Sequence, residues 1–217
     1  MKVYKPKTVN ELELFYGDLL FKIEDYKSIS DHLGELSTKM WEGVQAKNEA
    51  VLKEISNYHW KHLGKPATLL LAANLTEEDC RQSIANEYGF RRWTEVAHIA
   101  SPYNSVFEAL VNAMLEGNFD TVKRLISENG NIVNCKSPYG HKATLLHYAV
   151  SNGVELWRQK VPLNLPEIVA YLIEQGANRK AKMKVYGGEY MAAELLPSSA
   201  HPVDAGISKE LRKQFES

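Results

Sequence analysis

The chain has 217 residues, of which 44% are hydrophobic and 24% are charged, and its 26 basic residues nearly balance 27 acidic ones. This is the composition of an ordinary globular protein, and it excludes collagen-like, disordered and disulfide-stapled chains. Charge-free stretches are too short to cross a membrane, and the basic N-terminus has no apolar export segment behind it. We therefore expect a cytoplasmic protein with no membrane partner, in which Cys80 and Cys135 are free thiols.

Residues 1–101 are expected to form an α-helical N-terminal region. Apolar residues between Leu12 and Ile23 recur with the spacing of one helical face. Residues 36–63 contain two short amphipathic runs, which we interpret as a helix pair. Because no linker rich in Gly, Pro or Ser interrupts the chain, Ser101–Ser105 is the one plausible seam before a second region, residues 102–217.

His59 and His62 stand three positions apart, a spacing that places two imidazoles on one helix face and is compatible with a metal ion. The sequence offers no adjacent carboxylate and no third ligand that can be placed beside them. We therefore expect a structural or surface role and no metal. Walker, dinucleotide-binding and Gly-x-Ser-x-Gly motifs are missing as well, so no cofactor and no catalytic residue is assigned.

Residues 76–100 have the rough outline of a DNA-binding helix-turn-helix. Thr76 is a good helix N-cap, because acidic side chains follow it and a first helical turn favours anions. Arg91 and Arg92 stand near the start of the second expected helix, which begins about Trp93 and would enter the major groove. Acidic residues outnumber the cations of this segment, so we favour a structural role for the helix pair.

Two segments in the second region repeat the same pattern. Phe107–Gly117 and Thr144–Gly153 are each amphipathic, with a small residue four positions before the final glycine. A second amphipathic run follows each glycine, and Gly and Asn recur after that run, where a helix often ends in a left-handed residue. This pattern predicts a helix–turn–helix unit of roughly 33 residues, which buries its apolar face only by stacking on further copies.

The segment Thr144–Gly153 reads Thr-Leu-Leu-His-Tyr-Ala-Val-Ser-Asn-Gly and is similar to the Thr-Pro-Leu-His-x-Ala-x-x-x-Gly core of ankyrin repeats. Residues 166–178 resemble the family's second helix and its Gly-Ala-Asn ending. The resemblance implies an all-α ankyrin-type helical repeat solenoid with short β-hairpin fingers, here at residues 132–142 and 180–188. In that pattern His147 forms hydrogen bonds within and between repeats. Several further motifs resemble small bacterial ankyrin-repeat proteins, and this narrower likeness implies no reaction.

The resemblance implies about three repeats in residues 102–217, with residues 36–63 as a diverged ankyrin-like pair. Two departures from the pattern stand out. Residues 154–165 form an insertion between the two helices of one repeat. The last unit, residues 189–217, is degenerate because Pro197 interrupts its first helix, and we interpret it as a capping repeat.

One charge asymmetry suggests a binding surface. Residues 129–146 and 175–188, which should hold the fingers and their approaches, carry no Asp or Glu but several cations: Lys136, Lys142, Arg179, Lys180, Lys182 and Lys184. Finger tips are where ankyrin stacks usually bind partners. We expect noncatalytic recognition of an unidentified, acidic protein partner, which higher salt should weaken. The same cations could instead bind nucleic acid, or simply form a solvated face.

Aromatic residues and histidines supply the alternatives. Tyr139, His141 and Tyr186 are grouped with the cations as partner-binding residues, and together with His201 they could instead line a pocket for a small molecule or an enzymatic substrate. Trp157, in the insertion, has the aromatic character and cationic neighbours that are common at interface hot spots. Trp157 could form a second binding site, as an alternative to the cations, or it could pack back onto the expected repeat stack.

Overall fold

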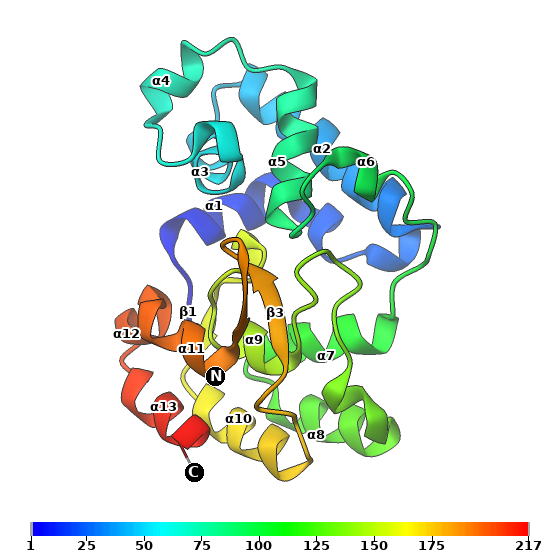
Figure 1. Ribbon diagram of the computed structural model, residues 1–217, viewed down its shortest axis with the longest axis vertical. Coiled ribbons are helices and arrows are strands. Elements are labelled where there is room, and N and C mark those ends of the chain that lie inside the picture. Colours follow the sequence, from blue (N-terminus) through cyan, green and yellow to red (C-terminus); the bar gives the residue numbers. More distant parts are fainter. Residues whose placement is uncertain (1, 217) are drawn as a thin grey trace. The chain divides into compact units, whose positions relative to one another are not determined.

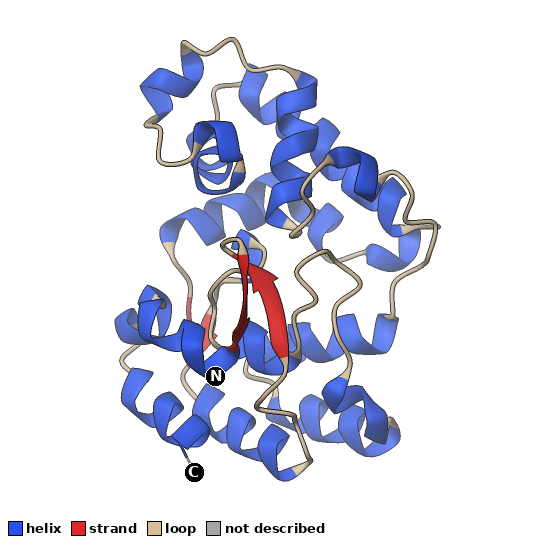
Figure 2. Ribbon diagram, viewed as in Figure 1, coloured by secondary structure: helices blue, strands red, loops and turns tan. Residues whose placement is uncertain are grey.

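The computed structural model describes residues 2–216. The chain is mostly helical, with 61% helix and 6% strand, which confirms the predicted all-α class (Figure 2). It divides into two compact units, one of residues 7–103 and one that joins residues 2–6 to residues 104–216. The division after Tyr103 lies inside the segment Ser101–Ser105, whereas nothing in the sequence indicated that residues 2–6 belong with the C-terminal unit.

The 7–103 unit is built around α2 (Ile29–Gln45), α3 (Glu49–Tyr58) and α5 (Glu77–Glu87). Both α2 and α3 pack against α5, and α1 (Lys7–Tyr16) packs against α2 and α3. Shorter elements complete the unit: η1 (Gly17–Leu20), η2 (Ile23–Asp25), η3 (Trp60–His62), α4 (Ala67–Leu71) and α6 (Trp93–Val96). Residues 36–63 do hold a helix pair, α2 with α3, although α2 begins earlier, at Ile29.

Two local predictions in this unit can be checked directly. Thr76 caps α5 as expected: its hydroxyl accepts from the backbone N–H of Asp79, and the Asp79 carboxylate accepts from the backbone N–H of Thr76. The second helix of the outlined helix-turn-helix, α6, is only four residues long. An element of one turn is shorter than the recognition helix that this motif places in a major groove.

In the C-terminal unit, α7 (Ser105–Leu115) pairs with α8 (Phe119–Glu128), and α9 (Leu145–Ala149) packs against α7, α10 (Leu165–Glu174) and α11 (Ala192–Leu195) (Figure 1). The unit ends with η6 (Leu196–Ser198), α12 (Ala200–Asp204) and α13 (Ser208–Glu216). Pro197 lies in η6, which directly follows α11. It therefore interrupts the first helix of residues 189–217, as predicted.

Left-handed glycines follow three helices of this unit: Gly117 and Gly176 stand directly after the C-caps of α7 and α10, whereas Gly153 lies four residues after α9 ends at Ala149. Gly117, Gly153 and Gly176 all have positive φ, the conformation that L side chains avoid. At Gly153 space is also short: a Cβ would lie 2.7 Å from Cγ2 of Val185. The glycine therefore allows β3 (Lys182–Val185) to pass close to the end of α9.

One of the two predicted fingers forms and the other does not. β3 and β4 (Gly188–Met191) make an antiparallel hairpin in which Lys184 pairs with Glu189, and its turn uses positive φ at Tyr186 and Gly187. Residues 132–142 were predicted to be a hairpin, and this is wrong. They contain the end of η4 (Gly130–Asn134) and an irregular loop, whose backbone and side-chain polar groups bond to one another rather than across a strand pair.

The insertion at 154–165 belongs to the interior. It contains η5 (Leu156–Arg158) and β2 (Val161–Pro162), which pairs with β1 (Val3–Tyr4). Leu163 N–H adds a bond of 3.1 Å to the carbonyl of Lys2. The N-terminal residues thus complete the C-terminal unit through a short two-stranded sheet.

Candidate basic binding surface

The structure separates the predicted partner-binding residues into exposed and buried groups. Tyr139, His141 and Trp157 are at most 4% exposed, so their side chains form part of the core and present no surface to a partner. The indole of Trp157 packs against Arg158, whose guanidinium lies 4.5 Å from the ring centroid. Tyr186 is 70% exposed, Arg179 is half-buried, and the five lysines are exposed: Lys136, Lys142, Lys180, Lys182 and Lys184.

Four of these lysines come from two segments that lie side by side. The N–H of Lys184 on β3 donates to the carbonyl of His141 at 2.7 Å, and Nζ of Lys136 donates to the carbonyl of Lys182 at 3.3 Å. We define the basic surface as Lys136, Lys142, Lys182 and Lys184. Lys180 stands just before it, where its N–H donates to Oδ1 of Asn178 at 2.9 Å.

The lysines of the basic surface lie close enough to repel one another. Partial burial lowers the pKa of Lys142, and the charges of Lys184 and Lys136 lower it further. The backbone of Lys142 also takes a positive φ of 55°, and its ammonium donates to the carbonyl of Pro138 at 2.9 Å. Like charges and a left-handed backbone both cost stability, so the remaining structure must impose this arrangement. One carboxylate stands nearby, since Glu189 is the cross-strand neighbour of Lys184.

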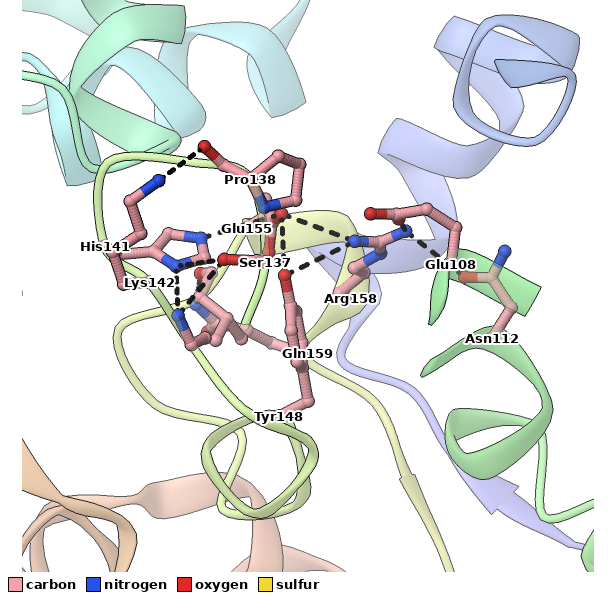
Figure 3. Close-up of polar contacts among 12 residues, drawn as sticks. Glu108, Asn112, Ser137, Pro138, His141, Lys142, Tyr148, Glu155, Arg158 and Gln159 are labelled. Carbon is pink, nitrogen blue, oxygen red and sulfur yellow. Dashed lines mark hydrogen bonds and ion pairs between the residues drawn. The ribbon is translucent and has the colours of Figure 1, made fainter. Parts of the chain in front are cut away.

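A buried ion network lies beside the loop that carries Lys142 (Figure 3). The guanidinium of Arg158, only 1% exposed, donates to Glu108 on α7 at 2.5 Å and to Glu155 at 3.4 Å. It also reaches Asn112 and the hydroxyl of Tyr148, each at 3.5 Å. The network thus joins α7, α9 and the insertion.

His141 extends this network into the loop. Its Nδ1 accepts from the N–H of Ala143 at 3.1 Å, so the ring proton sits on Nε2, which faces Oε1 of Glu155 at 3.7 Å. The hydroxyl of Ser137 lies 3.2 Å from the same Nδ1. These contacts anchor the loop on which Lys136 and Lys142 stand.

The pKa values of the two carboxyl groups of the network are shifted in opposite directions. Burial raises the pKa of Glu108, and Arg158 only partly offsets that effect. Burial acts in the same direction on Glu155, but the neighbouring Arg158 and His141 outweigh it, and the pKa of Glu155 is lowered. Because these groups are closed to solvent, their role is to hold the loop and the insertion in place.

The alternative pocket does not assemble as expected. The hydroxyl of Tyr186 donates to Oδ1 of Asn152 at 2.6 Å, and Nε2 of His201 contacts Oε1 of Gln159 at 3.1 Å. Tyr139 and His141 do lie together, with ring centroids 5.5 Å apart, but both are buried. The structure thus brings two of the four proposed lining residues together and gives the other two separate partners.

His147 has the structural role that the sequence pattern implied. Its Nδ1 accepts from the N–H of Thr144 at 3.1 Å and contacts the hydroxyl of Thr144 at 2.8 Å. Its Nε2 lies 3.0 Å from the carbonyl of Tyr190 on β4. This imidazole therefore joins the start of α9 to the next hairpin.

Sequence reasoning missed the residues whose partners are distant. The sequence analysis treats Glu155 and Arg158 only as charged neighbours of Trp157 and gives Glu108 no role; the available signal is the group of charged residues inside an otherwise apolar insertion. Asp79, which approaches His59 and His62, was read only as part of a helix cap.

Comparison of the chain with protein-family models, with curated proteins and with solved structures finds no match. Among the described residues, every helix falls short of the length and apolarity that a membrane crossing requires.

Proposed function

We propose that this protein is a cytoplasmic, noncatalytic recognition protein that binds an acidic segment of a partner protein through its basic surface. The observation that carries the proposal is the gathering of Lys136, Lys142, Lys182 and Lys184 on two adjoining segments, anchored from behind by the Arg158 network. Among the described residues, none of these four ammonium groups forms an ion pair with a carboxylate within 4.0 Å. The cations are therefore available to an external anion.

We further propose that the C-terminal unit is an ankyrin-type stack of about three repeats, of the kind found in small bacterial proteins. The pairs α7–α8 and α9–α10 support this idea, as do the glycine turns at Gly117 and Gly153 and the hairpin that follows α10. Partner binding at the finger side is expected for such a stack. A preformed surface of this kind lowers the ordering cost of association.

A binding experiment with a matched control tests the proposed function. A fluorescently labelled peptide rich in Glu and Asp is titrated with the full chain at low and at physiological salt. Reversing Lys142, Lys182 and Lys184 to Glu should weaken binding at least ten-fold, because three attractive charges become repulsive. The control reverses three exposed cations of α13 in the same unit: Lys209, Arg212 and Lys213.

Two outcomes would overturn the proposal. If both triple variants lose affinity equally, the peptide responds to net charge and not to the basic surface. If a single-stranded oligonucleotide of equal charge binds the wild type more tightly than the peptide does, nucleic acid becomes the preferred partner class. Binding that weakens with salt is expected in either case and does not discriminate between them.

A further inference from the structure

His59, His62 and Asp79 converge in the 7–103 unit. Each of them offers one ligand atom, and these atoms lie within 4.8 Å of one another. His59 directly follows α3, His62 closes the short turn η3, and Asp79 lies in the first turn of α5. The two histidines do not stand on one helix face, as their spacing suggested, because the chain turns after Tyr58 and directs both imidazoles toward α5.

The distances between the ligand atoms of this cluster are longer than hydrogen bonds and are closer to the separations between ligands that share one metal ion. Oδ1 of Asp79 lies 3.5 Å from Nε2 of His59 and 4.0 Å from Nε2 of His62. A hydrogen bond would bring these atoms to about 2.7–3.2 Å. Two ligands that each lie about 2.0–2.1 Å from a tetrahedral Zn²⁺ are themselves roughly 3.3–3.4 Å apart. A small inward movement of the imidazoles would close the cluster around a metal.

The surroundings orient the carboxylate of Asp79 toward the two histidines. Both imidazoles are buried, whereas the Asp79 side chain retains 20% exposure, which leaves a path from solvent. Oδ2 of Asp79 is held by the N–H and the hydroxyl of Thr76 at 2.9 and 2.7 Å. These bonds orient the carboxylate so that Oδ1 faces the histidines, which is how outer contacts position metal ligands.

Two hydrogen-bond contacts of the histidines oppose metal binding. One of them, from Lys65, can be removed by substitution. Nδ1 of His59 accepts from the N–H of Lys61 at 3.2 Å, and Nδ1 of His62 lies 3.1 Å from the ammonium of Lys65. An imidazole that binds metal through Nε2 carries its proton on Nδ1, so both contacts must be given up. Lys65 also adds a positive charge beside the site. Its ammonium therefore competes with a cation.

We propose that His59, His62 and Asp79 bind one divalent transition-metal ion, with Zn²⁺ as the reference ion and water completing its coordination. Two imidazoles and a carboxylate form a ligand set that suits Zn²⁺ and related ions. The proposal assigns a binding site and no reaction. It is independent of the basic surface, which lies in the other unit.

Binding of the metal alone to the full chain tests this proposal. Protein freed of metal by a chelator is titrated with Co²⁺, whose visible spectrum reports its coordination, and with Zn²⁺ against a chromogenic chelator. We expect one equivalent to bind. His59→Gln, His62→Gln and Asp79→Asn should each lower the affinity at least ten-fold, and Lys65→Met should raise it. His98→Gln, which removes an exposed imidazole of the same unit, is the matched control and should change nothing.

Circular dichroism and thermal melting of each variant establish that the chain remains folded. Failure of the folded wild type to bind Co²⁺ or Zn²⁺ would overturn the proposal. Equal affinities for the wild type and for the folded His59 and His62 variants would overturn it as well, because the metal would then bind elsewhere. Tighter binding by Lys65→Met, with no change in His98→Gln, would identify these three residues as the site.

Discussion

The hydroxyl of Tyr16 on α1 donates to Oε2 of Glu54 on α3 at 2.8 Å in the interior of the 7–103 unit. The carboxyl group of Glu54 and that of Glu87 on α5 are both buried there, since each residue is 2% exposed. Burial raises the pKa of Glu54 to about 7, although the hydrogen bonds from Glu87 and Tyr16 oppose the shift.

The buried carboxyl group of Glu54 should make the 7–103 unit less stable as the pH rises. The pKa of Glu54 is about 7 when folded and 4.5 in the reference state, so the folded chain binds more protons between these values. The stabilisation is complete below pH 4.5 and is lost as the pH rises toward 7, by at most about 1.4 kcal/mol per pH unit. Glu54→Gln should flatten this dependence in urea unfolding at pH 5 and pH 7.5. A variant that follows the wild-type slope would contradict the assignment.

His147 should give the C-terminal unit the opposite pH dependence. Burial lowers the pKa of this imidazole to about 4 from 6.5, although the bond to Tyr190 opposes the shift. The unfolded chain then binds more protons between these values, so stability falls as the pH drops below 6.5, by up to about 1.4 kcal/mol per unit. Amide hydrogen exchange, followed by mass spectrometry at pH 5 and pH 7, separates the two units after correction for intrinsic exchange rates. His147→Phe should abolish the response of β4 and α9, and a retained response would refute this cause.

Removing Arg158 should destabilise the C-terminal unit severely. Arg158→Met keeps much of the side-chain volume but leaves Glu108 and Glu155 buried without their cation, which costs about 3–5 kcal/mol. Arg124→Met on α8 is the matched control, because its ion pair with Glu128 is more than half exposed and worth at most about 1 kcal/mol. Urea unfolding measures both variants. Similar losses for the two would mean that the buried network adds little.

Two glycine substitutions separate backbone strain from crowding. Gly153 and Gly176 both have positive φ, but a Cβ at Gly176 would meet nothing within 4 Å, whereas one at Gly153 would meet Val185. Gly176→Ala should cost about 1–2 kcal/mol from its left-handed backbone alone. Gly153→Ala should cost roughly 1–3 kcal/mol more, because β3 must move away. Thermal unfolding measures the difference, and equal losses would show that Val185 moves aside without cost.

The local features of this chain could be read from its sequence. Thr76 and Asp79 cap a helix because three positions separate them, and Gly117 ends α7 through its own backbone freedom. The resemblance to the ankyrin pattern implied the hydrogen-bonding role of His147. In each case the decisive partner lies within a few positions, or the motif itself implies it.

Features that depend on distant partners could not be read in this way. Arg158 meets Glu108 across 50 positions, and Asp79 approaches His59 only because the chain turns after α3. The predicted finger at residues 132–142 failed for a related reason. The polar groups of that loop are satisfied by Ser137, His141 and the neighbouring β3, so it needs no second strand of its own.

The pairing of β1 with β2 has a consequence for biosynthesis. On the ribosome, residues 2–6 are synthesised before the 7–103 unit, and the strand that receives Val3 and Tyr4 is synthesised after it. Val3 and Tyr4 therefore stay unpaired until Val161 and Pro162 have been made, and the C-terminal unit can be completed only then. A substitution that weakens this strand pairing would accordingly disturb the unit whose two parts are made furthest apart in time.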